Sequence, residues 1–182
     1  NHSKINYKFD YRNNSIILYG ENHINRNINF PENFSVIIKD GTSIDFKSKA
    51  YLKFNGSLVF SGKEKNPIKV YGNNLGTIII SDTLNKKNNL IIKHANFENL
   101  VENVHDGIRY MGGITVLSEA IVEISNSVFS GFLSEDTINL KGFNKLKVIL
   151  SENKFKNIIN DGVDLDFVSN AIIFNNIVSG ST

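Results

Sequence analysis

Two short acidic segments hold the densest set of carboxylate and amide oxygens in this chain of 182 residues. They begin at Asp136 and Asp161 and read D-T-I-N-L and D-G-V-D-L, so that Asn139 of the first matches Asp164 of the second. Calcium binds about six to eight such oxygens at about 2.3 to 2.6 Å and tolerates irregular geometry. The pattern therefore predicts a Ca²⁺ site formed by Asp136, Asn139, Asp161 and Asp164, and it indicates no organic cofactor.

The same segments also have a purely structural interpretation. Lys141 follows the first segment and Asp166 follows the second at the matching position. Opposite charges on neighbouring strands form ion pairs worth about 0.2 to 1 kcal/mol. In this interpretation Asp136 and Asp161 accept backbone N–H bonds at turns. Both interpretations require the two segments to lie side by side.

A repeat in the sequence supplies that arrangement. Short apolar motifs recur around Phe97, Phe129, Phe155 and Val178, at successive separations of 32, 26 and 23 residues. Self-similarity of this period indicates stacked structural units. Equivalent side chains of stacked coils lie about 4.8 Å apart and form ladders, whereas a sandwich or barrel gives no reason for such equivalence. The repeat predicts a parallel β-helix.

Strand patterns are frequent and helical periodicity is poor. Fourteen runs are predicted as strands: residues 15–19, 34–39, 42–46, 50–54, 57–60, 68–71, 77–80, 89–93, 114–117, 121–124, 137–140, 145–150, 163–166 and 171–174. Alternation predicts which side chains face the interior, namely Ile114, Val116, Ile138, Leu140, Val163 and Leu165. Two outer rows are then expected to face solvent, one with Thr115, Asn139 and Asp164 and the other with Leu117, Lys141 and Asp166.

The turns between units have their own signature. Asn99 and Asn157 occupy the position that Gly131 and Gly180 occupy in other units. Asn and Gly are the residues that best tolerate a left-handed backbone, and stacked Asn side chains form amide ladders. We therefore expect a left-handed turn at this point of each unit.

The N-x-F-x-N turn that begins at Asn153 and the D-G-V strand opening at Asp161 resemble right-handed parallel β-helix proteins of the pectin-lyase-like superfamily. The resemblance covers about half of the chain, residues 87–180. It implies an all-β, right-handed parallel β-helix over residues 31–182, with an irregular or capping N-terminal region at residues 1–30. We expect the chain to be part of a longer protein with flanking domains.

The resemblance also implies a function, namely recognition or lyase-like or hydrolase-like processing of an extracellular polysaccharide by a secreted or cell-surface protein. Asp161 and Asp164 would be the acid/base residues, with Lys141 or Arg109 as the base. The second paired Asp-Asp, the Gly-His-Gly and the Arg-x-Lys elements of polygalacturonase-like hydrolases are absent. A non-catalytic scaffold or interaction module is the alternative.

Arg109 lies in a segment, residues 104–113, that departs from the repeat. We expect a turn insertion there, and the alternative is a loop that overhangs the acidic strands.

Charge and hydropathy limit the remaining partners. The net charge of +2 comes from 20 basic and 18 acidic residues, which gives no basis for nucleic-acid binding. The chain contains no run of 18 apolar residues, so the sequence gives no indication of membrane insertion. It contains no Cys, which excludes disulfides.

Overall fold

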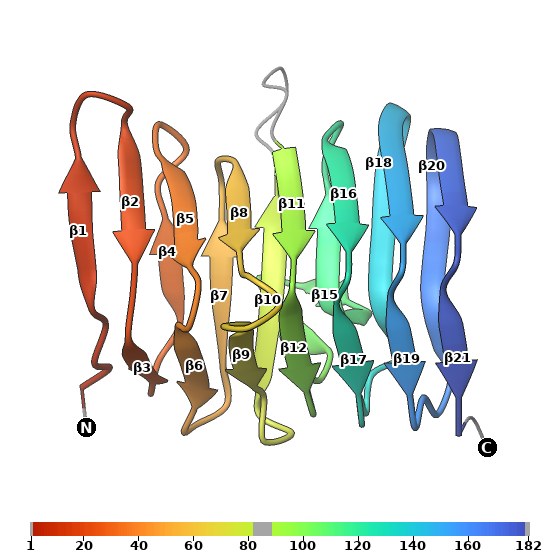
Figure 1. Cartoon of the computed structure of the whole chain (residues 1–182), viewed down its shortest axis with the longest axis horizontal. Coiled ribbons are helices and arrows are strands. Elements are labelled where there is room, and N and C mark those ends of the chain that lie inside the picture. Colours follow the sequence, from red (N-terminus) through yellow and green to blue (C-terminus); the bar gives the residue numbers. More distant parts are fainter. Residues whose placement is uncertain (1, 82–88, 181–182) are drawn as a thin grey trace.

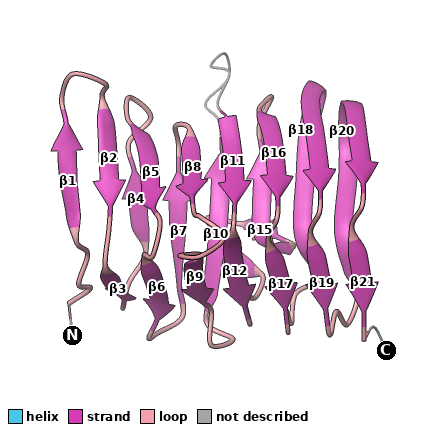
Figure 2. Cartoon of the chain, viewed as in Figure 1, coloured by secondary structure: helices cyan, strands magenta, loops and turns pink. Residues whose placement is uncertain are grey.

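Strands form all the regular secondary structure in the part of the chain described by the computed structural model, residues 2–81 and 89–180 (Figure 2). That part contains no helix long and apolar enough to cross a membrane. The strands stack side by side into a parallel β-solenoid of about six turns, with the two termini at opposite ends (Figure 1). The predicted parallel β-helix is thereby confirmed.

Each full turn contributes one strand to each of three faces, here named A, B and C. Face A contains β4 (Ile28–Phe30), β7 (Ala50–Phe54), β10 (Gly76–Ser81), β15 (Gly112–Leu117) and the first parts of β18 (Asp136–Ser151) and β20 (Asp161–Phe174). Face B contains β2 (Ser15–Leu18), β5 (Ser35–Lys39), β8 (Leu58–Ser61), β11 (Asn89–Lys93), β16 (Ile121–Ser125) and the second parts of β18 and β20. Face C contains β3 (Glu21–Ile24), β6 (Ser43–Phe46), β9 (Ile68–Tyr71), β12 (Ala95–Glu98), β17 (Val128–Ser130), β19 (Lys154–Lys156) and β21 (Ile177–Ser179).

The N-terminal end of the solenoid is closed by an antiparallel strand. Strand β1 (Tyr7–Asp10) pairs antiparallel with β2, whereas β2 pairs parallel with β5. An antiparallel neighbour covers the backbone groups that an edge strand would otherwise expose. Parallel stacking thus begins at Ser15, inside the segment 1–30 that the sequence assigns to the cap, and the covering strand itself is Tyr7–Asp10.

All fourteen predicted strands coincide with observed strands, although two pairs of them are joined at a corner into the long strands β18 and β20. The strands that alternation does not reveal include β12, β17, β19 and β21, which have three or four residues each. In β17 and β19 the central Phe is the only buried side chain of the strand. A pattern of period two needs a longer segment to be visible.

The phenylalanine motifs form the ladder that the repeat predicts. Phe97 pairs in register with Phe129, Phe129 with Phe155, and Phe155 with Val178. The ring centroids of Phe97 and Phe129 are 5.1 Å apart with an interplanar angle of 2°, and those of Phe129 and Phe155 are 5.1 Å apart at 16°. Phe97 and Phe129 are fully buried. This column fixes the register of successive turns on face C.

The Asn and Gly turn positions are left-handed, as expected. The φ angles are 53° at Asn99, 65° at Gly131, 51° at Asn157 and 67° at Gly180. A Cβ atom at Gly131 would lie 2.2 Å from Oδ1 of Asn99, and one at Gly180 would lie 2.6 Å from Oδ1 of Asn157. Asn and Gly therefore alternate because each Asn side chain occupies the space over the following glycine.

A Gly131→Ala variant should consequently unfold more easily than the matched variant Gly107→Ala. Both glycines have positive φ, 65° and 74°, which costs an alanine about 1 to 2 kcal/mol. Only Gly131 has a close neighbour, because nothing lies within 4 Å of a Cβ built at Gly107. Urea unfolding of both variants measures the difference. Equal losses of stability would show that the contact with Asn99 imposes no constraint.

Candidate functional site

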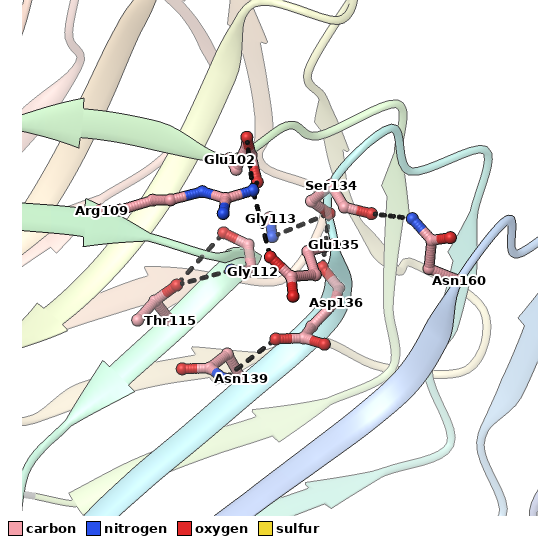
Figure 3. A network of polar contacts seen from close by, with 10 residues as sticks. All are labelled: Glu102, Arg109, Gly112, Gly113, Thr115, Ser134, Glu135, Asp136, Asn139 and Asn160. Atoms are coloured by element: carbon pink, nitrogen blue, oxygen red, sulfur yellow. Dashed lines mark hydrogen bonds and ion pairs between the residues drawn. The ribbon is translucent and has the colours of Figure 1, made fainter.

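The acidic segments lie side by side in the predicted register. Strand β18 pairs with β20 so that Asp136 is opposite Asp161, Asn139 opposite Asp164 and Lys141 opposite Asp166. The amide nitrogen of Asn139 donates to Oδ2 of Asp136 at 2.9 Å and to Oδ2 of Asp164 at 3.0 Å. Figure 3 shows the Asp136 end of this network below Glu135 and Arg109. One buried amide thus joins two carboxylates from successive turns.

Asp136 has an unusual environment within this network. Its side chain is buried, with only 3% of the residue exposed. The pKa of Asp136 is raised from 3.8 to about 6, mainly by burial. The hydrogen bond from Asn139 lowers the pKa, and the negative charges of Asp164, Glu135 and Asp161 raise it. Near pH 6, Asp136 is therefore about half protonated. A carboxyl group in this state can donate or accept a proton.

Residues 104–113 form a structure over face A. Strands β13 (Asn103–His105) and β14 (Ile108–Tyr110) make an antiparallel hairpin. Tyr110 packs with Tyr51 and Ile79 in a second buried cluster outside the solenoid core, and Leu117 contacts that cluster. The hydroxyl of Tyr51 is 2.8 Å from Nε2 of His105. The segment is therefore more than a turn insertion, because it covers the outer surface of β7, β10 and β15.

This cover corrects the predicted exposure of the outer rows. Thr115 and Asn139 have the predicted register, but each is only 1% exposed. The hydroxyl of Thr115 bonds to the backbone of Gly112, donating to its carbonyl oxygen at 3.2 Å and accepting from its N–H at 3.1 Å. Alternation within a strand predicts that a side chain points away from the core, but it does not predict what another segment places above it. On the C-terminal side of the hairpin, face A is open over β20 and at the Lys141 end of β18.

Arg109 connects the hairpin to the acidic strands. One of its nitrogens, Nη2, lies 2.9 Å from Oε2 of Glu102 and 3.1 Å from Oε2 of Glu135 (Figure 3). The hydrogen bond and charge of Glu102, followed by the charge of Glu135, raise the pKa of Arg109 above its already high ordinary value. A guanidinium group held in this way stays charged. The geometry supports a role for Arg109 in positioning Glu135 and gives no support to its role as a base.

Lys141 forms the predicted ion pair with Asp166, at 3.4 Å between Nζ and Oδ2. Both side chains are partly exposed, so the contribution of the pair to stability is at most about 1 kcal/mol. The Lys141 nitrogen also lies 5.9 Å from the ring centroid of Phe167. The structural interpretation of this pair is confirmed. It leaves the role of Lys141 in catalysis as a prediction.

The predicted calcium ligands are only partly brought together. Asn139 bonds to Asp136 and Asp164, while Asp161 is exposed at the start of β20. Within residues 2–81 and 89–180, no group of three or more His, Asp or Glu side chains is arranged to hold a metal ion. Calcium binding stays a prediction.

Sequence reasoning missed two aromatic residues at the corner between faces A and B. Phe143 is 58% exposed and Phe167 is 62% exposed. Strict alternation after Leu165 places Phe167 inside, but its backbone is left-handed, with φ of 53°, and the chain turns there. A bulky residue in this conformation is uncommon. The available signal was that an aromatic follows both Gly142 and Asp166 at the ends of matching segments.

Comparisons with known protein families, curated proteins and solved structures find no match to this chain. The likeness to the pectin-lyase-like superfamily therefore extends as far as the parallel β-solenoid that the chain forms.

Proposed function

We propose that the open part of face A, over β20 and the Lys141 end of β18, recognises a polysaccharide outside the cell, and that the chain belongs to a secreted or cell-surface protein. The observation that carries this proposal is the register of β18 and β20. It places the partly exposed Lys141 beside Asp166, and the buried amide of Asn139 beside the partly exposed Asp164, so that polar groups repeat from one turn to the next along the solenoid axis.

The shape and chemistry of this surface suit an extended polymer. Parallel strands repeat about every 4.8 Å, which presents equivalent groups in rows along a flat sheet. Carboxylates accept hydrogen bonds from sugar hydroxyls, and the lysine ammonium donates to hydroxyl and ring oxygens. Asp164 and Asp166 are both partly exposed and able to accept such bonds. The hairpin packs on β7 and β10, which precede this surface along the solenoid axis.

Binding to a panel of polysaccharides, measured by calorimetry, tests the proposal. Asp164→Asn should weaken binding by about tenfold, because a hydrogen bond to a charged acceptor contributes about 1.5 to 3 kcal/mol. Glu123→Gln makes the same change of charge on β16 of face B, away from the proposed surface, and should leave binding unchanged. Equal affinities for wild type and Asp164→Asn would contradict the proposal. Failure of every polysaccharide to bind would favour the non-catalytic scaffold.

Hydrolysis is a second candidate function, favoured by the shared amide of Asn139. Asp136, with a pKa of about 6, and Asp164 accept from the same nitrogen, so one protonated and one ionised carboxyl group can lie close together. Glycoside hydrolases use such a pair. Asp136 is buried, so a substrate could reach it only if neighbouring side chains moved. Release of reducing ends that is abolished in Asp164→Asn would support catalysis.

A further inference from the structure

The outer surface of face B carries a row of aliphatic side chains. Each member lies between two inward-facing residues of its strand, and strand pairing aligns the members from β2 to β20. The members are Ile17, Ile37, Val59, Ile91, Glu123, Ile149 and Ile172. None belongs to the solenoid core, and all except Ile17 are partly or fully exposed. On face A, by contrast, the outer apolar residues Tyr51 and Ile79 are covered by Tyr110 of the hairpin.

Lysines lie on both sides of this row. Lys39, Lys93 and Lys147 are each two residues away from a member of the row, the first two on one side and the third on the other, so their side chains also point outward. All three are exposed, and none forms an ion pair with another described residue. Glu123 is the only acidic residue on the described strands of face B. Face B is therefore cationic, although the net charge of the chain is only +2.

Face B is broad as well as cationic. Figure 1 shows its strands side by side in one row along the solenoid axis. Strands from seven turns at a spacing of about 4.8 Å, with about four to five residues each, give an area about 30 Å long and about 15 Å wide. A linear polymer would contact one row of this area. A planar partner would contact the lysines on both sides and the Ile and Val side chains between them, which offer a sugar ring no aromatic face.

We infer that face B adsorbs to a lipid surface that contains anionic phospholipids. The lysine ammonium groups pair with the headgroup phosphates, and the aliphatic row enters the boundary between headgroups and acyl chains. Such adsorption needs no membrane-spanning segment. The polysaccharide surface proposed above lies on face A and takes no part in it, so the inference does not rest on that proposal.

Co-sedimentation with phospholipid vesicles tests the inference. The chain should partition at least about tenfold more strongly into vesicles of phosphatidylcholine with phosphatidylglycerol than into vesicles of phosphatidylcholine alone, because each lysine near an anionic surface contributes about fivefold. Added salt should weaken the binding, since salt screens charge. Equal partitioning into the two kinds of vesicle, or binding to neither, would overturn the inference.

Charge variants assign the binding to face B. Lys93→Ala and Lys147→Ala should each weaken partitioning into the anionic vesicles by about fivefold. Lys156→Ala removes the same charge from an exposed position on β19 of face C and should have little effect. If all three variants weakened binding equally, the total charge of the chain would be responsible and the assignment to face B would be wrong.

Two variants of the row itself complete the test. Glu123→Gln removes the only negative charge of the face and should strengthen partitioning by about fivefold, a gain that loss of the fold cannot produce. Ile91→Ser should weaken partitioning by about three- to tenfold, because less apolar surface is buried. Val104→Ser removes an aliphatic side chain that is 65% exposed on the hairpin and should have no effect. Unchanged partitioning of Glu123→Gln and Ile91→Ser would contradict contact through the row.

An acidic polymer is the other partner that a cationic face attracts. If polygalacturonate binds through Lys93 and Lys147 while the vesicles do not bind, face B recognises a polymer and the inference fails. Asp164→Asn, which tests polysaccharide recognition on face A, should bind anionic vesicles as the wild type does. The two proposals can therefore fail separately.

Discussion

Replacing Phe129 with alanine is expected to lower the free energy of unfolding by about 3 to 5 kcal/mol, the usual cost of removing a buried aromatic ring. Phe129 is fully buried and stacks between Phe97 and Phe155, with both centroid distances at 5.1 Å. It also contacts Phe132 edge to face at 6.3 Å. Its removal therefore leaves a cavity and deprives three rings of a partner. Urea unfolding followed by circular dichroism measures the loss.

Two variants make this result specific. Phe129→Leu keeps an apolar side chain in the column and should cost less than the alanine variant, since more of the buried volume is retained. Phe143→Ala removes a ring that is 58% exposed and should change stability by no more than about 0.5 kcal/mol. If Phe129→Ala and Phe143→Ala had equal effects, the column of rings would not be what holds successive turns together.

The fold could be predicted because equivalent single residues recur at the same point of successive turns. Each turn of a parallel solenoid contacts mainly its neighbours, so equivalent positions experience the same constraint and accept similar side chains. The equivalence of Phe97, Phe129, Phe155 and Val178 was enough to align four turns, and that alignment agrees with the observed pairing. The left-handed turns at Asn99 and Gly131 agree with it as well.

The hairpin could not be predicted in the same way, because residues 103–110 break the repeat and have no equivalent in other turns. Its packing depends on Tyr110 meeting Tyr51 and Ile79, which come from turns distant in sequence. Nothing in the alternation of β7 and β10 indicates that their outer side chains are covered. Thr115, which is opposite Ile79, and Asn139, which is opposite Thr115, are buried in the strands next to this cluster.

The candidate site shows the same division. The register of Asn139 with Asp164, and of Lys141 with Asp166, follows from the repeat alone. The outward direction of the Phe167 ring depends on a departure from regular backbone. The φ of Phe167 is 53°, which reverses the direction that alternation assigns to the ring. The distinct behaviour of Asp136 depends on its burial, which the sequence does not show.

That burial has a measurable consequence for stability as pH changes. The pKa of Asp136 is raised from 3.8 to about 6 in the folded chain, mainly by burial. Between about pH 4 and pH 6 the folded state therefore binds more protons than the unfolded state, so this group makes the fold more stable as pH falls through that range. A shift of this size corresponds to at most about 3 kcal/mol.

Asp136→Asn should remove this dependence. The asparagine is uncharged and can still accept the hydrogen bond from Asn139, so the variant should be more stable than wild type at pH 7 and similar to it near pH 4. Asp10 and Asp40 have lowered pKa values, and their contribution to stability is lost as pH falls, but they act equally in both proteins. The difference between the two urea-unfolding series, measured from pH 4 to pH 8, therefore isolates Asp136. Parallel curves would mean that the carboxyl group is ionised in the folded chain as readily as in the unfolded one, and that the acid required for hydrolysis is absent.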